Sequence, residues 1–141
     1  MADAVTSQVI LDGERLVIMK FTNISDGTGE SGVVKIDVSA LAPNTWQQAC
    51  NGVTINKIWA MTMGMGVDIL FDATADVICV TIPANINYRD DFSSFGGIKN
   101  NAGAGKTGDV LFTTVDDAEI GDRYTIILEC IKTYNPIGGI Q

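Results

Sequence analysis

The run DRYTIILECIKT, residues 122–133, decides the fold class that we expect for this chain. Side chains of an extended strand alternate between two faces. One face is then entirely apolar, with Tyr124, Ile126, Leu128 and Cys130, and the other is mixed, with Thr125, Ile127, Glu129 and Ile131. This pattern predicts a strand that is buried on one side and half covered on the other. Together with the preceding run GDVLFTT, residues 108–114, it is expected to form the central strands of a sandwich.

Other apolar runs of strand length occupy residues 7–12, 14–23, 33–38, 52–63, 67–72 and 77–82. The first three are interpreted as an antiparallel meander that turns at Asp12-Gly13, and the last two as a hairpin. Roughly eight strands without a sustained helical period indicate an all-β fold. We therefore predict a single domain over residues 1–141, an antiparallel β-sandwich or jelly-roll-like barrel with long loops and extended termini.

Several local expectations follow from the same patterns. In the run 33–38 the expected inward side chains are Val34, Ile36 and Val38, and the outward ones are Val33, Lys35 and Asp37. In the run 52–63, Ile55, Lys57, Trp59 and Met61 are expected on one face, before the glycines of MTMGMG break the strand. Trp46 is interpreted as a plug over one end of the core, and residues 88–95 as a short helix. Residues 1–6 are expected to be an N-terminal arm, and residues 134–141 an extended C-terminal tail.

Composition limits the function. The net charge is −8 and the pI is near 4.2, which argues against a nucleic-acid partner because phosphate contacts need clustered Lys and Arg. Only 18% of residues are charged while 46% are hydrophobic. Burial of part of the exterior against other chains is favoured over an ordinary well-filled core.

The chain shows no secretory or membrane signal. Its first residues lack a basic segment followed by a long apolar one, and no window holds the ~20 apolar residues of a spanning helix. Cys50, Cys79 and Cys130 are an odd number at wide spacing, so three free thiols and a reducing compartment are favoured over a disulfide.

The common catalytic and ligand motifs fail when their residues are counted. The chain has no histidine, which removes Ser-His and Cys-His nucleophiles and zinc sites that need imidazole. The sequence GAGKT at 103–107 has Asn100 where a phosphate-binding loop needs its first glycine, and a strand is expected after it where that loop needs a helix.

Acidic residues give no stronger site. The loop from Asp26 to Glu30 lacks the sixth-position glycine of an EF-hand, so a solvated hairpin tip is preferred, with a weak ion site of another kind left open. The pairs Asp68 with Asp72 and Asp90 with Asp91 lack a sugar-stacking platform beside them. Glu129 is interpreted as a cross-strand or subunit contact, with Lys20 or Lys132 as the candidate partner. No catalytic, cofactor-binding or metal-ligating residue is assigned.

Two parts of the sequence carry a resemblance to a known group of proteins: DGERLVIMKFTNISDGTGES with VVKIDVSAL, within residues 12–41, and GDVLFTT with GDRYTIILECIKT, within residues 108–133. In these parts the chain resembles the small β-rich virion proteins of tailed bacteriophages, especially marine and cyanobacterial phages. The resemblance implies a non-enzymatic capsid decoration (cement) protein on the capsid exterior, made in the host bacterial cytoplasm. Its implied partners are the major capsid protein and copies of itself as a homotrimer, with no nucleic acid and no membrane.

Three other roles stay open. A tail-tube, head–tail connector or other virion assembly component is the main alternative. A carbohydrate-binding or hydrolytic module and a non-viral structural β domain are the weaker ones.

Overall fold

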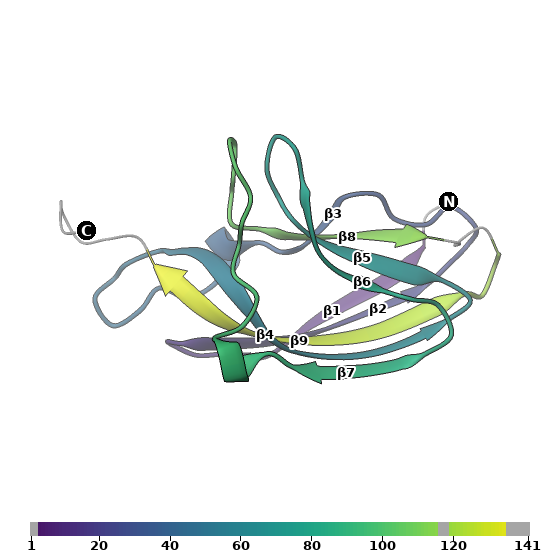
Figure 1. The fold of residues 1–141 in the computed structure, drawn as a ribbon, viewed down its shortest axis with the longest axis horizontal. Coiled ribbons are helices and arrows are strands. Elements are labelled where there is room, and N and C mark those ends of the chain that lie inside the picture. The colour runs from purple at the N-terminus through teal and green to yellow at the C-terminus, as the bar shows by residue number, and fades with distance from the viewer. Residues whose placement is uncertain (1–2, 116–118, 135–141) are drawn as a thin grey trace.

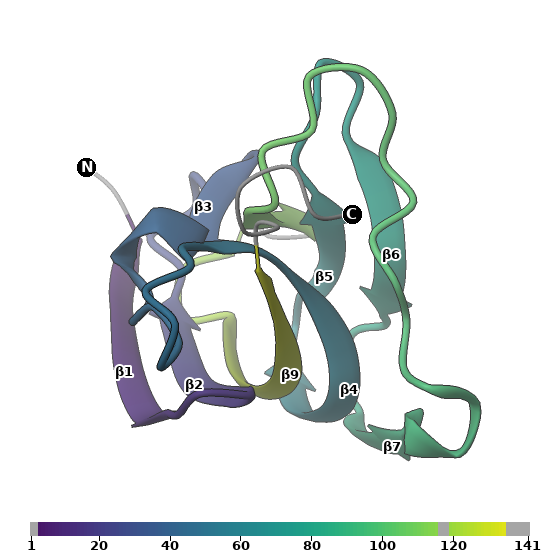
Figure 2. The same cartoon turned by 90° about the vertical axis from the view of Figure 1, so that its left-hand side faces the viewer.

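The computed structural model describes residues 3–115 and 119–134, which form two antiparallel sheets packed face to face (Figure 1). The five-stranded sheet has the order β1-β2-β9-β4-β7, and the four-stranded sheet has the order β3-β8-β5-β6. Figure 2 shows the larger sheet as a curved trough with the smaller sheet across its open side. The expected all-β sandwich is confirmed.

The strand bounds are β1 (Ala4–Asp12), β2 (Leu16–Ile24), β3 (Val33–Ile36), β4 (Cys50–Met63), β5 (Gly66–Phe71), β6 (Val77–Ile82), β7 (Asn87–Asp91), β8 (Val110–Val115) and β9 (Arg123–Tyr134). Two short 3-10 helices cover Val38–Ala40 and Ser93–Phe95. The described residues therefore hold nine strands, one more than the roughly eight predicted from the sequence.

Strand β9 occupies the centre of the larger sheet, between β2 and β4. Its apolar face is fully buried, whereas the mixed face is only half buried, as its alternation predicts. Phe112 on β8 joins the two sheets because its ring meets Phe21 of β2 edge-on at 5.2 Å and Tyr124 of β9 at 5.7 Å. Each such side chain contributes about 1.5–3 kcal/mol on burial, and the hydrophobic cluster runs across both sheets.

Both predicted hairpins are present. Strands β1 and β2 pair through the turn at Asp12-Gly13, where the Gly13 N–H donates to the Leu16 carbonyl at 2.8 Å. Strands β5 and β6 pair as expected, and Val67, Ile69 and Phe71 line the buried face of β5.

The predicted meander is wrong at its third strand. Strand β3 pairs with β8 and belongs to the smaller sheet, so the chain crosses between sheets after β2. The β3–β8 register shifts between Val34 and Ile36, which makes Lys35 the extra residue of a bulge. The bulge leaves Val34 48% exposed and turns the Lys35 side chain inward, opposite to the expected faces.

A second bulge changes the faces of β4. The register with β9 shifts between Ile55 and Lys57, so Asn56 is the extra residue. Ile55 is therefore in the core, while Trp59 and Met61 face the solvent side of the larger sheet. The sequence pattern predicts that Ile55, Lys57, Trp59 and Met61 share one face. Lys57, Trp59 and Met61, which follow the bulge, do share a face, and Ile55, which precedes it, does not.

The expected arm and the expected helix are both replaced by strand. Residues 4–6 belong to β1, because Ala4 pairs with Ile24, and residues 1–2 lie outside the described part of the chain. The backbone at 87–91 pairs with the edge of β4 as β7, so only Ser93–Phe95 is helical. Tyr134 completes β9, and the rest of the expected tail, 135–141, lies outside the described residues.

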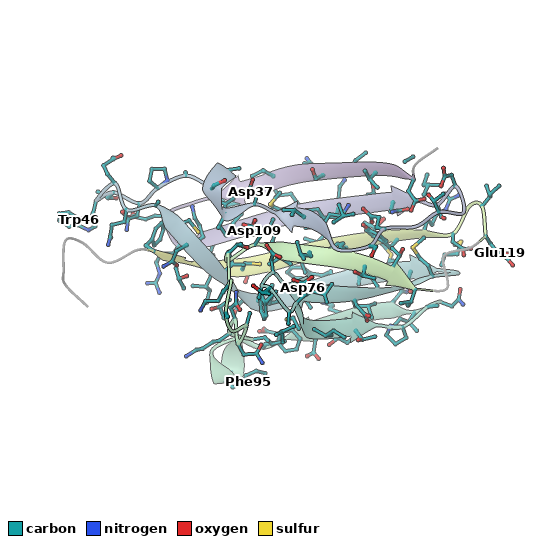
Figure 3. All side chains as sticks on the ribbon, turned by 90° about the horizontal axis from the view of Figure 1, so that it is seen from above. Asp37, Trp46, Asp76, Phe95, Asp109 and Glu119 are labelled. Atoms are coloured by element: carbon teal, nitrogen blue, oxygen red, sulfur yellow. The ribbon has the colours of Figure 1, made fainter. Side chains whose placement is uncertain are left out.

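Trp46 does not plug the core. It is 73% exposed and lies at one end of the sandwich, opposite the end that carries Glu119 (Figure 3). Polar contacts to the β1–β2 turn hold its loop: the Ala42 N–H donates to Asp12 at 2.9 Å and the Thr45 N–H to Glu14 at 2.9 Å. These contacts fix the loop and leave the indole outside.

Candidate binding surfaces

The first candidate surface is the solvent side of β9, β4 and β7, which we call the open-sheet face. Strand register places Trp59 between Ile127 and Arg89, and Met61 between Thr125 and Asn87. Met61 is 56% exposed, and these side chains line an almost entirely apolar groove of about 230 Å³. The groove can accept an apolar side chain from another molecule.

A charged rim borders this face. Lys57 lies 3.9 Å from Asp91 and 3.8 Å from Glu129, and a shallow pocket of about 360 Å³ opens between Lys57, Trp59 and Arg89. The Ser93 hydroxyl and backbone N–H lower the pKa of the Asp91 carboxyl, so it stays ionised near neutral pH. The rim can therefore offer both charge signs to a polar partner.

Glu129 is a cross-strand contact, as predicted, but its partners differ from those expected. The Asn56 amide donates to its carboxylate at 2.7 Å, and Lys57 is the nearby cation. Lys132 instead contacts Asp12 at 2.6 Å, and Lys20 lies opposite Ile127 in the sheet.

The second candidate surface lies at the other border of the larger sheet, and we call it the sheet-edge surface. Strand β1 is an end strand that is exposed along Ala4–Leu11, and it faces β3 across a groove of about 190 Å³. The exposed apolar side chains of this surface are Val5, Val9, Ile10 and Leu11 from β1 and Val33 and Val34 from β3.

A buried polar cluster joins the sheets behind this surface. The Glu30 carboxylate lies 2.5 Å from the Lys35 ammonium, and it accepts hydrogen bonds from the Tyr124 hydroxyl at 2.6 Å and the Asn23 amide at 2.8 Å. Burial, followed by the Glu30 contact, raises the pKa of Tyr124 well above its usual range. Asp3 extends the cluster because it accepts from Asn23 at 3.0 Å. The Glu30 carboxylate is thus held by one cation and two hydrogen-bond donors, which indicates a structural role, while the Asn23 Oδ1 atom is buried without a hydrogen-bond partner among the described residues.

The Asp26–Glu30 loop gives no support to an ion site. Glu30 points into the buried cluster, and Asp26 accepts from the Thr28 N–H at 3.1 Å and the Thr28 hydroxyl at 2.6 Å. Within residues 3–115 and 119–134, no group of three or more Cys, Asp or Glu side chains is arranged to hold a metal.

The remaining acids and the glycine-rich loop have structural contacts. Asp68 accepts from Thr81 at 2.8 Å, and Asp72 accepts from Thr107 at 2.7 Å. Thr107 ends the GAGKT loop, which lies against the β5–β6 turn and leads into strand β8 as expected. The two acids are therefore not paired in a cleft.

The three cysteines are free thiols, as predicted. Cys50 and Cys130 are buried and Cys79 is partly buried. Burial raises the pKa of Cys79 to about 12 and raises that of Cys130 as well. The thiols stay protonated near neutral pH and act as small apolar side chains.

Sequence reasoning missed the sheet-edge surface. The sequence does contain a signal for this surface. The run VTSQVIL at residues 5–11 has no charged residue, in a chain whose net charge is −8. The outward position of Trp59 could not be read in the same way, since it depends on the β4 bulge.

No helix in the described part of the chain is long and apolar enough to cross a membrane.

Comparisons with known proteins leave the family open. No family model matches the sequence, and no curated protein matches it. Among solved structures, a mutant of a family 29 carbohydrate-binding module aligns with 96% of this chain and 100% of its own, at 12% identity and a TM-score of 0.35. A likeness this weak says nothing about ligand or origin.

Proposed function

We propose that this chain is a non-enzymatic structural protein of a tailed-phage virion, a decoration protein that binds the outer capsid surface and stabilises the shell. The supporting observation is the presence of two separate surfaces that expose apolar side chains, the open-sheet face on β9, β4 and β7 and the sheet-edge surface on β1 and β3. A subunit that bridges a lattice needs more than one contact surface, and large exposed apolar patches usually mark interfaces.

The energetics suit this role. A protein that binds only the assembled shell stabilises that shell by mass action, and many modest contacts on one lattice act together. The acidic charge of −8 limits non-specific aggregation of an exposed subunit. Major capsid protein and copies of the chain itself are the partners in this proposal, and the capsid exterior is its location.

Within this role we assign the open-sheet face to the capsid. The Trp59–Met61 groove can take an apolar side chain, and Lys57 and Arg89 beside it can meet capsid carboxylates. Rim charges of both signs fix orientation more than they add affinity.

The test uses capsids of the encoding phage that lack this protein. Met61→Glu places a charge in the groove at a position 56% exposed, and Ile78→Glu is the matched control, since Ile78 is 54% exposed on β6 of the other sheet. We expect the Met61 variant to lower the number of copies that co-sediment with capsids by at least about tenfold and the Ile78 variant to leave it unchanged. Equal binding of both variants would refute the assignment of the face.

Quantitative mass spectrometry and electron microscopy of purified virions separate the alternatives. Copies spread over the whole shell support decoration, whereas a ring at one vertex or along the tail supports a connector or tail-tube component. Absence from the virion rejects both.

A second candidate function is carbohydrate binding. The observation that favours it is the Trp59 indole in a shallow pocket with Arg89 and Asp91, since an aromatic ring with polar neighbours suits a sugar. Glycan-array binding by the isolated protein that disappears in Trp59→Ala and persists in Trp46→Ala would favour this function over decoration.

A further inference from the structure

The free edge of β1 offers backbone hydrogen-bonding groups whose identity follows from the neighbouring strands. At the two ends of the β2–β9 ladder, the Ser25 N–H donates to the Asp122 carbonyl at 2.7 Å and the Lys132 N–H to the Arg15 carbonyl at 2.8 Å. Antiparallel pairs alternate between hydrogen-bonded and non-hydrogen-bonded. The odd-numbered residues of β2 therefore bond to β9, and its even-numbered residues bond to β1.

This alternation sets the direction of the groups on β1. Ala4, Thr6 and Gln8 lie opposite even-numbered residues of β2, so their N–H and C=O groups point toward β2. The N–H and C=O groups of Val5, Ser7 and Val9 then point away from the sheet. An end strand with regular outward groups is a template for another strand.

Strand β1 lacks the usual protection of an edge. No charged residue or proline occurs from Ala4 to Leu11, and its bulge at Ile10 comes late enough to leave Ala4–Val9 regular. The opposite edge, β7, carries Arg89, Asp90 and Asp91, and β3 has only four residues with a bulge at Lys35. Charges, bulges and short length are the devices that keep edges from pairing.

We propose that β1 pairs antiparallel with β1 of a second copy of this chain, with Ser7 on the twofold axis. In this register Val5 lies opposite Val9 of the second copy, Ser7 lies opposite Ser7, and Val9 lies opposite Val5. All three are hydrogen-bonded pairs because they use the outward groups. The larger sheets of two copies would then form one continuous ten-stranded sheet.

Side chains support the same register. Val5 pairs with Asn23 of β2 and Val9 with Met19, so both valines are on the core-facing side of the sheet. They are nevertheless 47% and 54% exposed, because the smaller sheet does not cover them. The pairing places valine against valine on this uncovered side, and β-branched cross-strand pairs stabilise a sheet.

Charge favours a second copy as the occupant. Two chains of net charge −8 repel each other over most of their surfaces, and the uncharged strand β1 allows a close approach. A twofold interface also requires a self-complementary surface, and the alternation of Val5, Ser7 and Val9 about Ser7 provides one. This pairing does not depend on the proposed capsid role, and it favours a dimer over the homotrimer that the sequence resemblance implied.

The test uses charge at the axis. Ser7 is exposed, so Ser7→Asp and Ser7→Lys should fold normally, yet each places two like charges opposite each other in the dimer. In sedimentation equilibrium, we expect wild type to have twice the 15.0 kDa chain mass. Each variant alone should raise the dimer dissociation constant at least about tenfold, and an equal mixture of the two should restore the dimer. Ser94→Asp and Ser94→Lys, exposed in the 3-10 helix Ser93–Phe95 and away from β1, are the matched controls and should stay dimeric.

Three results would overturn the proposal. The first is a wild-type protein that is monomeric at ~100 μM chain, and the second is an oligomer that Ser7→Asp leaves unchanged. The third is an equal mixture of the Ser7→Asp and Ser7→Lys variants that does not form the dimer. A monomer that takes up an extended strand from a different protein would reject the second copy as the occupant.

Discussion

Replacing Lys35 with methionine removes the cation from a carboxylate that lies inside the sandwich. The side chains of Lys35 and Glu30 are 6% and 5% exposed, and their charged atoms lie 2.5 Å apart. Removing one partner of a buried pair leaves an uncompensated charge, which costs about 3–5 kcal/mol. Tyr124 and Asn23 still donate to the carboxylate, so we expect the lower end, a loss of about 3 kcal/mol in the free energy of unfolding.

The reciprocal change, Glu30→Gln, leaves a buried ammonium and should cost a similar amount. The double variant carries neither charge of this pair, and its glutamine oxygen can still accept from Tyr124. We therefore expect the double variant to lose much less than the sum of the single losses, with a coupling free energy of at least about 2 kcal/mol.

The assay is urea unfolding of the four proteins at one fixed chain concentration, because dimerisation would shift apparent stability with concentration. Lys57→Met is the matched control: its ion pairs are 3.8 and 3.9 Å long and its side chain is 34% exposed, so it should cost less than about 1 kcal/mol. A coupling below about 1 kcal/mol, or a Lys57 variant as unstable as the Lys35 variant, would refute the reasoning.

Two further changes test the backbone and one raised pKa. Gly108 has φ +90°, and a Cβ added there would lie 2.1 Å from the Asn51 carbonyl, so Gly108→Ala should lower the free energy of unfolding by about 3 kcal/mol or more. Gly103→Ala, with open space around it, should change that free energy by less than about 0.5 kcal/mol, and equal effects in urea unfolding would contradict the steric argument. Burial raises the pKa of Asp109 above its ordinary value of 3.8, so its ionised form is less favourable in the folded chain, and stability falls as pH rises through the folded pKa. Asp109→Asn keeps an oxygen for the Val38 N–H, and because the site is partly solvated we expect a gain below about 1 kcal/mol near pH 7 that vanishes near pH 3. Thermal melts at both pH values check this, and a variant that is less stable near pH 7 would show that the wild-type carboxylate is favourable there.

Alternation along the sequence was sufficient for strands that are regular. The faces of β9 and β5 follow from a period of two residues, and the Asp12-Gly13 turn predicts the β1–β2 hairpin, because these features depend on neighbouring residues alone. The same local patterns indicated an all-β sandwich and three free thiols.

Bulges are where the sequence pattern failed. One extra residue at Lys35 and another at Asn56 reverse the alternation, so Val34 is exposed and Trp59 becomes part of the open-sheet face. A bulge arises from pairing with a partner strand that is distant in sequence, here β8 or β9, and local periodicity contains no information about that partner.

The sequence by itself determined the fold class, the central strand β9 and the acidic, sparsely charged composition. Only the tertiary structure decided which sheet holds β3, that residues 87–91 pair as β7, that Glu129 meets Lys57, and that β1 ends the sheet with its outward backbone groups free to meet another strand. The physical reason is range: side-chain alternation is set by adjacent residues, whereas strand order, edges and charge partners depend on contacts between segments many residues apart.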